Sequence, residues 1–506
     1  MSVATRFCCD EMKYPQVAWF AFMRSWLVWC CTQFGTYANS QLSNVGRVSN
    51  PTCGLKPDLQ GVANKRRQEC NTTLAVLAVM STLGGCATYS GSFGVIERNL
   101  ATQQYDSALK NIEKEKDSKT DRVLYFLNKG MVLRMKRDFA ASNEALEAAK
   151  AEMDRLYAAS VSENVLSVMV NDSTVSYSGD NFERVLLHLY MALNYLELGQ
   201  PDSARIEALQ LDAKLREFAE KVPESKHGED AFTLYLTGMI YEDRGERSDA
   251  MISYRSAYNV YKKYQANYAL SMPSMLKTDL MRMARQQGLT DELEKYKNEF
   301  GLELPANKAA DSGELVFVLN NGLAPIKREK AINSFDATTA SMVRIALPAY
   351  ESRRNNIVAA RVIVNDSQTV TELMEDIDAI AKKNLDSHMP AIVARSVARV
   401  VVKAASNKKV RQAALNNKNN DNAMAGALGA LAFQVATIAT ERADTRSWLT
   451  LPANIQMGRL SLPAGSYNVK VELLGANHQV VATQDYPGIV IKKSHKTFLT
   501  KHWSSN

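Results

Sequence analysis

Cysteine is missing from most of this 506-residue chain, because all seven cysteines lie within the first 86 residues. The other 420 residues therefore contain no disulfide scaffold, no cysteine-protease nucleophile and no thiolate metal site. An excess of charge of one sign is also lacking there, since 53 Lys and Arg are balanced by 50 Asp and Glu. A body so close to neutral lacks the basic surface of a nucleic-acid-binding protein.

Motifs of common enzyme chemistry are absent as well. The sequence has no GxxxxGK phosphate loop, no GxGxxG, no HExxH and no GxSxG. Its six histidines include no pair at metal-ligand spacing on a helix, and His188 falls at a position that is normally buried in a repeat core. We therefore expect a protein that is not an enzyme and that binds no cofactor and no metal.

A basic and then apolar segment ends at Cys86. The basic cluster at 65–67 precedes the apolar run 74–83, which is shorter than the ~20 residues of a membrane span. The run closes with Leu83-Gly84-Gly85-Cys86, which resembles the lipobox of bacterial lipoproteins. That resemblance implies a signal peptide at 62–86 and lipid attachment, including palmitate, at Cys86. Several acyl chains on one residue give stable anchoring.

The position of this signal inside the chain needs an explanation. Residues 1–61 hold five of the seven cysteines, and their apolar stretch 15–34 carries Arg24 near its middle. We expect 1–61 to be a non-native or disordered upstream extension, with the natural start at Val62. The alternative is a genuine transmembrane segment, although a lipid-facing arginine costs a few kcal/mol.

The apolar period becomes helical after residue 86. The segments 121–149, 185–211 and 231–257 each read as two helices joined by a short turn. In the third segment Gly238 is followed by Tyr241, Gly245, Ala250, Tyr254 and Ala257, at offsets of 3, 7, 12, 16 and 19. This spacing resembles the tetratricopeptide repeat. We expect 87–305 to form a TPR-like α-solenoid whose stacked pairs share one core.

The irregular segment 157–184 interrupts the repeats and is expected to form a loop. Insertions in solenoids often lie on the binding face, and a surface loop with no role is the alternative. The candidate partner-binding residues come from this loop and from the first helix of the third segment: Tyr177, Phe182, Phe232, Tyr235, Met239, Glu242 and Asp243. For any one of the aromatic residues, a place in the core is the alternative.

Strand signals appear after Pro305, so 311–506 is expected to be an α+β domain with a small β-sheet and packed helices. The whole chain would then be an α+β multidomain protein. Strands are expected at 314–319, 342–347, 357–364, 467–473, 480–483, 489–491 and 497–499, with a turn at 320–322. Helices are expected at 370–389 and 391–405, with Pro390 between them.

Two helical segments leave alternatives open. Arg395, Arg399 and Lys403 are spaced by four, and we expect this basic stripe to be a solvated helix face opposite Val397 and Val401, rather than an anion site. The Gly/Ala-rich segment 423–440 is expected to be a helix packed closely within the fold. A membrane-inserting role for that segment is the alternative.

Four segments, 177–196, 321–328, 388–395 and 443–452, resemble a family of uncharacterised tetratricopeptide-like lipoproteins of Gram-negative bacteria. The family has no established activity, so the resemblance implies architecture and location only. By resemblance to enterobacterial lipoprotein sorting, Ala87 in place of Asp implies the outer membrane, with the body facing the periplasm. We expect a scaffold for one or more envelope proteins. A regulator of peptidoglycan synthesis and an enzyme acting on envelope polymers are the alternatives.

Overall fold

The computed structural model describes residues 89–162, 174–221, 230–304, 311–336, 341–415, 429–431, 433–434 and 440–504. The expectations for residues 1–61, for the signal at 62–86 and for Cys86 lie outside these residues, as does most of 423–440. All of the described residues belong to one compact unit, Val76–Asn506.

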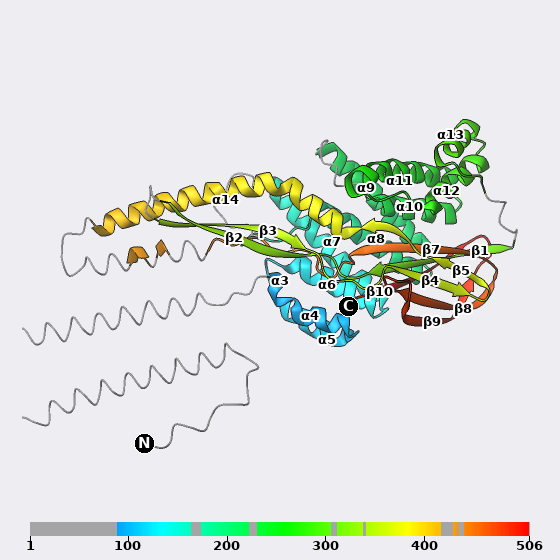
Figure 1. Cartoon of the computed structure of the whole chain (residues 1–506), viewed down its shortest axis with the longest axis horizontal. Coiled ribbons are helices and arrows are strands. Elements are labelled where there is room, and N and C mark those ends of the chain that lie inside the picture. The colour runs from blue at the N-terminus through cyan, green and yellow to red at the C-terminus, as the bar shows by residue number, and fades with distance from the viewer. Residues whose placement is uncertain are drawn as a thin grey trace, which may run out of the picture. The chain divides into compact units, whose positions relative to one another are not determined.

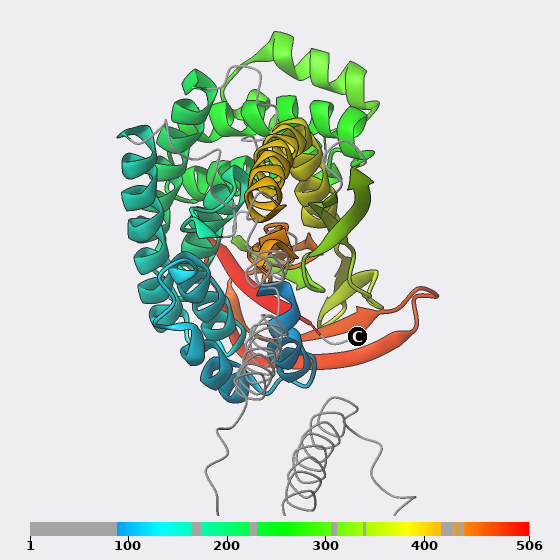
Figure 2. The same cartoon turned by 90° about the vertical axis from the view of Figure 1, so that its left-hand side faces the viewer.

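Helices fill the first part of this unit. They are α3 Tyr89–Ser92, α4 Gly94–Ala101, α5 Tyr105–Ile112, α6 Arg122–Met135, α7 Phe139–Ser162, α8 Asn181–Glu197, α9 Pro201–Lys221, α10 Ala231–Asp243, α11 Arg247–Tyr268, α12 Ser274–Gln286 and α13 Thr290–Phe300, with a short 3-10 turn at Glu113–Glu115. The helix pairs α6–α7, α8–α9 and α10–α11 coincide with the three segments predicted as repeats. Figure 2 shows these helices in an arc around the strands.

Small residues allow the two helices of a pair to approach closely. A Cβ added at Gly238 of α10 would lie 2.5 Å from the ring of Tyr254 and 3.2 Å from the carbonyl oxygen of Ala250 on α11. A Cβ added at Gly130 of α6 would lie 2.7 Å from Leu146 on α7. The helix pairs therefore pack as the glycine spacing predicts, and this packing is the basis for describing the helical part as TPR-like.

In the second part of the unit the described residues form three sheets. The strands are β1 Ser312–Asn321, β2 Ile326–Asp336, β3 Ser341–Glu351, β4 Ala359–Val364, β5 Ser367–Val370, β6 Glu372–Asp376, β7 Asn454–Pro463, β8 Gly465–Leu474, β9 Val480–Ile491 and β10 Lys496–Trp503. One sheet has the order β10-β1-β7-β6, another β5-β4-β8-β9, and β2 and β3 form a hairpin. Strand β1 pairs parallel with β10 and antiparallel with β7.

Strand β1 is buried on both faces, which explains its unbroken apolar run. Leu315, Phe317 and Leu319 point into the core between the two four-stranded sheets. Val316 and Val318 belong instead to the core of the helix pairs. The last helix before the sheets, α13, ends at Phe300 and β1 begins at Ser312, and the helical and β parts share this core.

Two local predictions in the β part are wrong. Asn320 and Asn321 continue β1 instead of forming a turn, because Tyr190 donates to the Asn320 side chain and the Asn321 amide donates to the Ile357 carbonyl oxygen. Of the three residues predicted as a turn, Gly322 alone, with φ of +71°, lies outside the strand.

The helices predicted at 370–389 and 391–405 are replaced by strand β6 over 372–376 and by one helix, α14 Ile377–Leu415, which contains Pro390. Figure 1 shows α14 running along β2 and β3, away from the helix pairs. None of the described helices is both long and apolar enough to serve as a membrane span.

The close approach at Gly238 gives a stability prediction. Replacing Gly238 with Ala should lower the free energy of unfolding by roughly 1–3 kcal/mol, since the added methyl group meets Tyr254. This loss should appear although alanine is the better helix former by about 1 kcal/mol. Urea unfolding measures it. Gly94→Ala is the matched control, because the nearest atom to a Cβ there is 3.8 Å away, and an equal loss in both variants would contradict the packing argument.

Candidate functional site

The groove expected along the first helices of the repeats is occupied by the chain's own sheet. Phe232, Tyr235 and Met239 are each 0% exposed. The backbone N–H of Phe232 donates to Glu375 of β6, and the Tyr235 hydroxyl accepts from Arg459 of β7. The prediction that these three residues face a partner is therefore wrong, because strands β6 and β7 already cover them.

The loop residues offered as partner contacts are also buried. Tyr177 is 8% exposed and Phe182 is 5% exposed. The Tyr177 hydroxyl donates to the Glu183 carboxylate at 2.5 Å, and the guanidinium of Arg446 lies over the Tyr177 ring. The expected exposed binding face at Tyr177 and Phe182 is thus wrong, since Arg446 and Glu183 enclose the ring. The middle of the inserted loop, 163–173, lies outside the described residues.

Glu183 is the centre of this enclosed region. Its carboxylate also accepts from the backbone N–H of Asp180, 3.0 Å away, and of Trp448, 2.8 Å away. Burial, together with the nearby charge of Asp180, raises the pKa of Glu183 to about 7, although the Tyr177 hydrogen bond opposes the rise. The helix-capping role expected for Glu183 is confirmed, because it forms a capping box with Asp180 at the start of α8.

His188, expected in the core, is indeed buried and lies 2.8 Å from Glu207 through its Nδ1 atom. Among the described residues, no group of three or more His, Cys, Asp or Glu side chains is placed to hold a metal ion.

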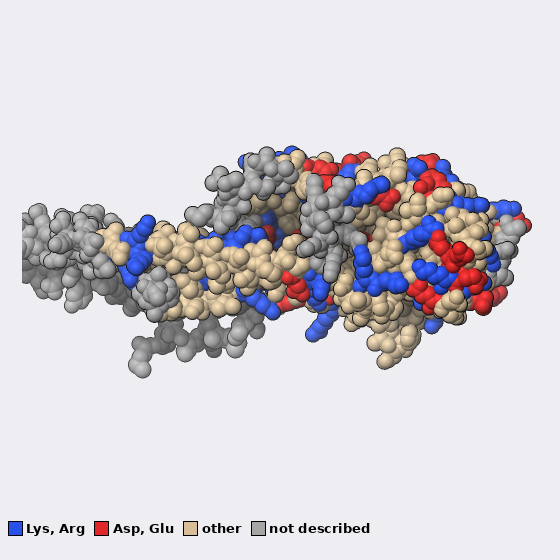
Figure 3. Space-filling view, turned by 90° about the horizontal axis from the view of Figure 1, so that it is seen from above, with Lys and Arg blue, Asp and Glu red and all other residues tan. Residues whose placement is uncertain are grey.

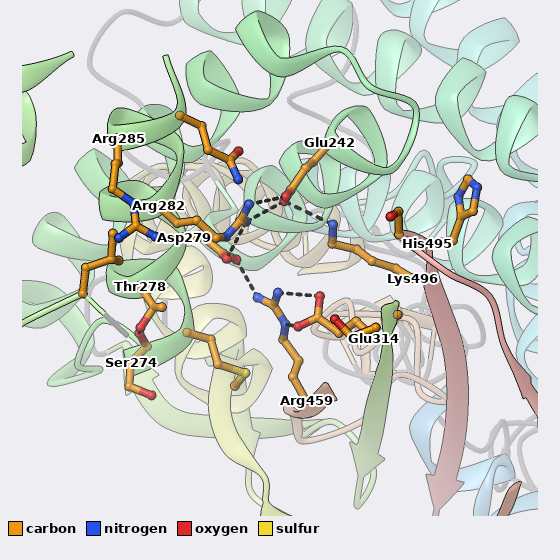
Figure 4. A pocket seen from close by; sticks show the side chains of 16 residues that line it. Glu242, Ser274, Thr278, Asp279, Arg282, Arg285, Glu314, Arg459, His495 and Lys496 are labelled. Atoms are coloured by element: carbon orange, nitrogen blue, oxygen red, sulfur yellow. Dashed lines mark hydrogen bonds and ion pairs between the residues drawn. The ribbon is translucent and has the colours of Figure 1, made fainter. Parts of the chain in front are cut away.

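An open pocket lies where the helix pairs meet the first sheet (Figure 4). Its volume is about 730 Å³. One wall is the face of α12 that carries Ser274, Thr278, Arg282 and Arg285. Of the seven predicted contact residues, Glu242 alone lines this pocket. Neighbouring Asp243 accepts from the backbone N–H of Lys496, 2.6 Å away.

Charged side chains form a continuous chain of ion pairs along the pocket. Arg282 contacts both Glu242 and Asp279, and Lys496 lies 3.1 Å from Glu242. Arg459 contacts Asp279 at 2.5 Å and forms a bidentate ion pair with Glu314, with distances of 2.7 and 2.9 Å. The chain joins α10 and α12 to β1, β7 and β10, so it links the repeats to the sheet.

The ion pairs keep Glu242 and Asp279 charged. Burial alone would raise the pKa of Glu242, but Lys496 and Arg282 outweigh it and lower this pKa to about 2. Arg459 and Arg282 likewise hold the pKa of Asp279 well below its usual range, against the effect of burial. A carboxylate with so low a pKa is a poor proton carrier at neutral pH. Glu242 and Asp279 are therefore charged hydrogen-bond acceptors at neutral pH rather than acid–base groups.

Sequence reasoning missed most of this site. Asp279 and Arg282 are three residues apart on one helix, which is a local ion-pair signal that was available. Glu314 and Arg459 have no such signal, because 145 residues separate them along the chain. Only the antiparallel pairing of β1 with β7 places them side by side.

Comparisons with known proteins add little. No family model matches the chain, and no curated protein matches its sequence. Solved structures that resemble it include a crystal structure of MamA, with 13% identity over 40% of this chain and 90% of MamA, at a TM-score of 0.25. A tetratricopeptide repeat protein from Parabacteroides merdae has 12% identity over 41% of this chain and 63% of its own, at a TM-score of 0.26.

PilF of Pseudomonas aeruginosa has 12% identity over 47% of this chain and 87% of its own length, at a TM-score of 0.28. Likeness at this level carries no argument about function. The TPR-like description of the helical part therefore rests on its own helix pairs.

The raised pKa of Glu183 predicts a pH dependence of stability. The folded chain holds a proton on Glu183 up to about pH 7, whereas the unfolded chain loses it near the ordinary value of 4.5. The stabilisation is therefore fully present below pH 4.5 and is lost as the pH rises through 7, by on the order of 3 kcal/mol at most.

Glu183→Gln should flatten this decline in the free energy of unfolding between pH 4.5 and 7.5, measured by urea titration at each pH. Glu294→Gln is the control, because Glu294 is a carboxylate at the surface with 62% of its side chain exposed. If the two variants show the same slope as the unmodified chain, Glu183 does not titrate in this range.

Proposed function

We propose that this protein is a lipoprotein of the outer membrane, faces the periplasm and acts as a non-enzymatic scaffold for envelope proteins. The location is supported by Leu83-Gly84-Gly85-Cys86, and Tyr89, three residues later, already begins a helix. The Tyr89 hydroxyl accepts from Asn128 of α6. A lipid on Cys86 would therefore hold the folded body within about 10 Å of the membrane surface.

The observation that carries the scaffold role is the open, charge-lined pocket between the repeats and the sheet. The inner face of the helix pairs is covered by the chain's own strands, so recognition has to use the parts of the surface that remain open. The pocket offers arginine side chains on α12 and several hydrogen-bonding groups. Four cations and three carboxylates line it, which favours a polar segment with acidic residues.

The lipid anchor is tested at Cys86. Cys86→Ser should abolish the incorporation of labelled palmitate and move the protein out of the outer-membrane fraction, since the thiol is the only atom that accepts the diacylglycerol. Metabolic labelling and membrane fractionation measure both effects. Cys70→Ser is the matched control and should change neither. Palmitate incorporation into the Cys86→Ser protein would overturn the anchor.

The pocket is tested at Arg285, which lines its α12 wall and is exposed. Arg285→Glu should reduce the yield of crosslinked envelope partners at least several-fold, because it reverses the charge offered to an acidic segment. The melting temperature should stay within a few degrees. Lys110→Glu, at an exposed position of α5, makes the same charge change away from the pocket lining. Equal yields from the two variants would contradict the use of this pocket.

A further inference from the structure

In its middle, over 394–407, α14 has mainly apolar side chains on its outer surface and mainly polar ones on its inner surface, the reverse of an ordinary surface helix. The stripe expected to be solvated faces inward, since Arg399 is 5% exposed and ion-paired to Glu441, which also binds Lys403 at 2.8 Å. Val397 and Val401, expected opposite a solvated stripe and thus inside, are 43% and 63% exposed. That prediction is wrong because Glu441 holds the cations on the inner side.

The hairpin of β2 and β3 beside α14 carries exposed apolar side chains on both of its faces, Ile332 on one and Phe335 with Met342 on the other. Arg344 and Glu329 form an ion pair, and Arg344 lies with Lys403 and Asn407 in the narrow space between β3 and α14. Ile332 is 62% exposed, Phe335 60% and Met342 42%. We call α14 with β2 and β3 the arm. In Figure 3 the upper face of the arm is mostly free of charged side chains, whereas acidic and basic groups mix over the helix pairs.

The hairpin also has two open edges. Within the described residues, β2 and β3 pair only with each other, over all eleven positions from Ile326 to Asp336. Their outer backbone N–H and C=O groups therefore face away from the pairing. An open edge next to exposed apolar side chains is a surface that readily accepts another strand.

We propose that the arm binds the arm of another copy of this chain, with β3 of one copy beside β2 of the next. Lipid would cover the apolar side chains but would leave the edge backbone groups without hydrogen bonds, at a cost of several kcal/mol each. A second arm satisfies both needs. Because β2 and β3 are antiparallel, β2 of the second copy would also run antiparallel to β3 of the first. The contact joins two different edges, so it extends to a ring or a chain of copies.

The size of the contact is adequate. Eleven paired residues give an edge about 36 Å long, and one helix layer on one strand layer is about 20 Å thick. Each copy would thus bury about 700 Å², close to the about 800 Å² per partner of a stable interface. Glu329 pairs with Arg344 within the arm, and Arg399 of the arm pairs with Glu441, so these groups add no like-charge repulsion at the contact.

Self-association is tested on the full chain with its seven cysteines replaced by serine, which removes the lipid attachment from the measurement. We expect sedimentation to give a mass of at least twice 56.2 kDa at micromolar concentration. Ile332→Asp and Val401→Asp should each weaken the association at least tenfold. Val480→Asp on β9 is the matched control, since Val480 is 48% exposed outside the arm, and it should have no effect.

The geometry is tested by mixing two variants of the cysteine-free chain, Ser334→Cys and Val343→Cys. These residues are direct partners in the register of the hairpin. Copies that associate in the same register would place Val343 of one copy beside Ser334 of the next. A short thiol crosslinker should join unlike variants more than like ones. A monomer at 100 µM, or a mass that the arm substitutions do not change, would overturn the proposal. If the protein stays a monomer and floats with phosphatidylethanolamine–phosphatidylglycerol vesicles only when its arm is unmodified, the arm binds lipid and the proposal of a second copy is overturned.

Discussion

The burial of strand β1 on both faces is the constraint on which the rest of the unit depends. One face of β1 closes the space between the two four-stranded sheets, and the other closes the core of the helix pairs. The helix stack therefore cannot present its inner face to another protein, because its own sheet already fills it. Arg459 adds an electrostatic tie at the same junction, through Glu314 on β1 and Asp279 on α12. A buried ion pair of this kind is costly to break from one side only.

This arrangement moves recognition away from the repeat groove to other parts of the surface. The pocket at the rim of the junction is open and polar, and its carboxylates Glu242 and Asp279 are held in the charged form by neighbouring cations. The arm is a different kind of surface, with several exposed apolar side chains and with the ion pair of Arg399 and Glu441 buried. The two surfaces suit two different partners, a polar segment at the pocket and another apolar surface with a strand edge at the arm.

Local sequence patterns were sufficient for the helix pairs. The offsets from Gly238 to Tyr254 lie within one helical hairpin, so the contact that requires glycine is set by residues close in the chain. The same holds for the capping box of Asp180 and Glu183. Strand β1 was also predictable, because burial on both faces leaves an unbroken apolar run. The helix pairs and the central strand of the unit followed from these signals.

The faces that are buried were decided only by the tertiary structure. Phe232 and Tyr235 looked like groove residues, but their partners, Glu375 and Arg459, lie 143 and 224 residues further along the chain. Helical periodicity shows that a face is apolar and cannot show which distant element covers it. Val397 and Val401 were predicted to lie inside for the same reason. The sequence of α14 places apolar residues on one face and cations on another, and Glu441 decides that Arg399 and Lys403 lie on the inner face. The sequence by itself determined the repeating helix pairs and the central strand, which rest on local contacts. The closed groove, the pocket and the reversed faces of α14 rest on long-range ones.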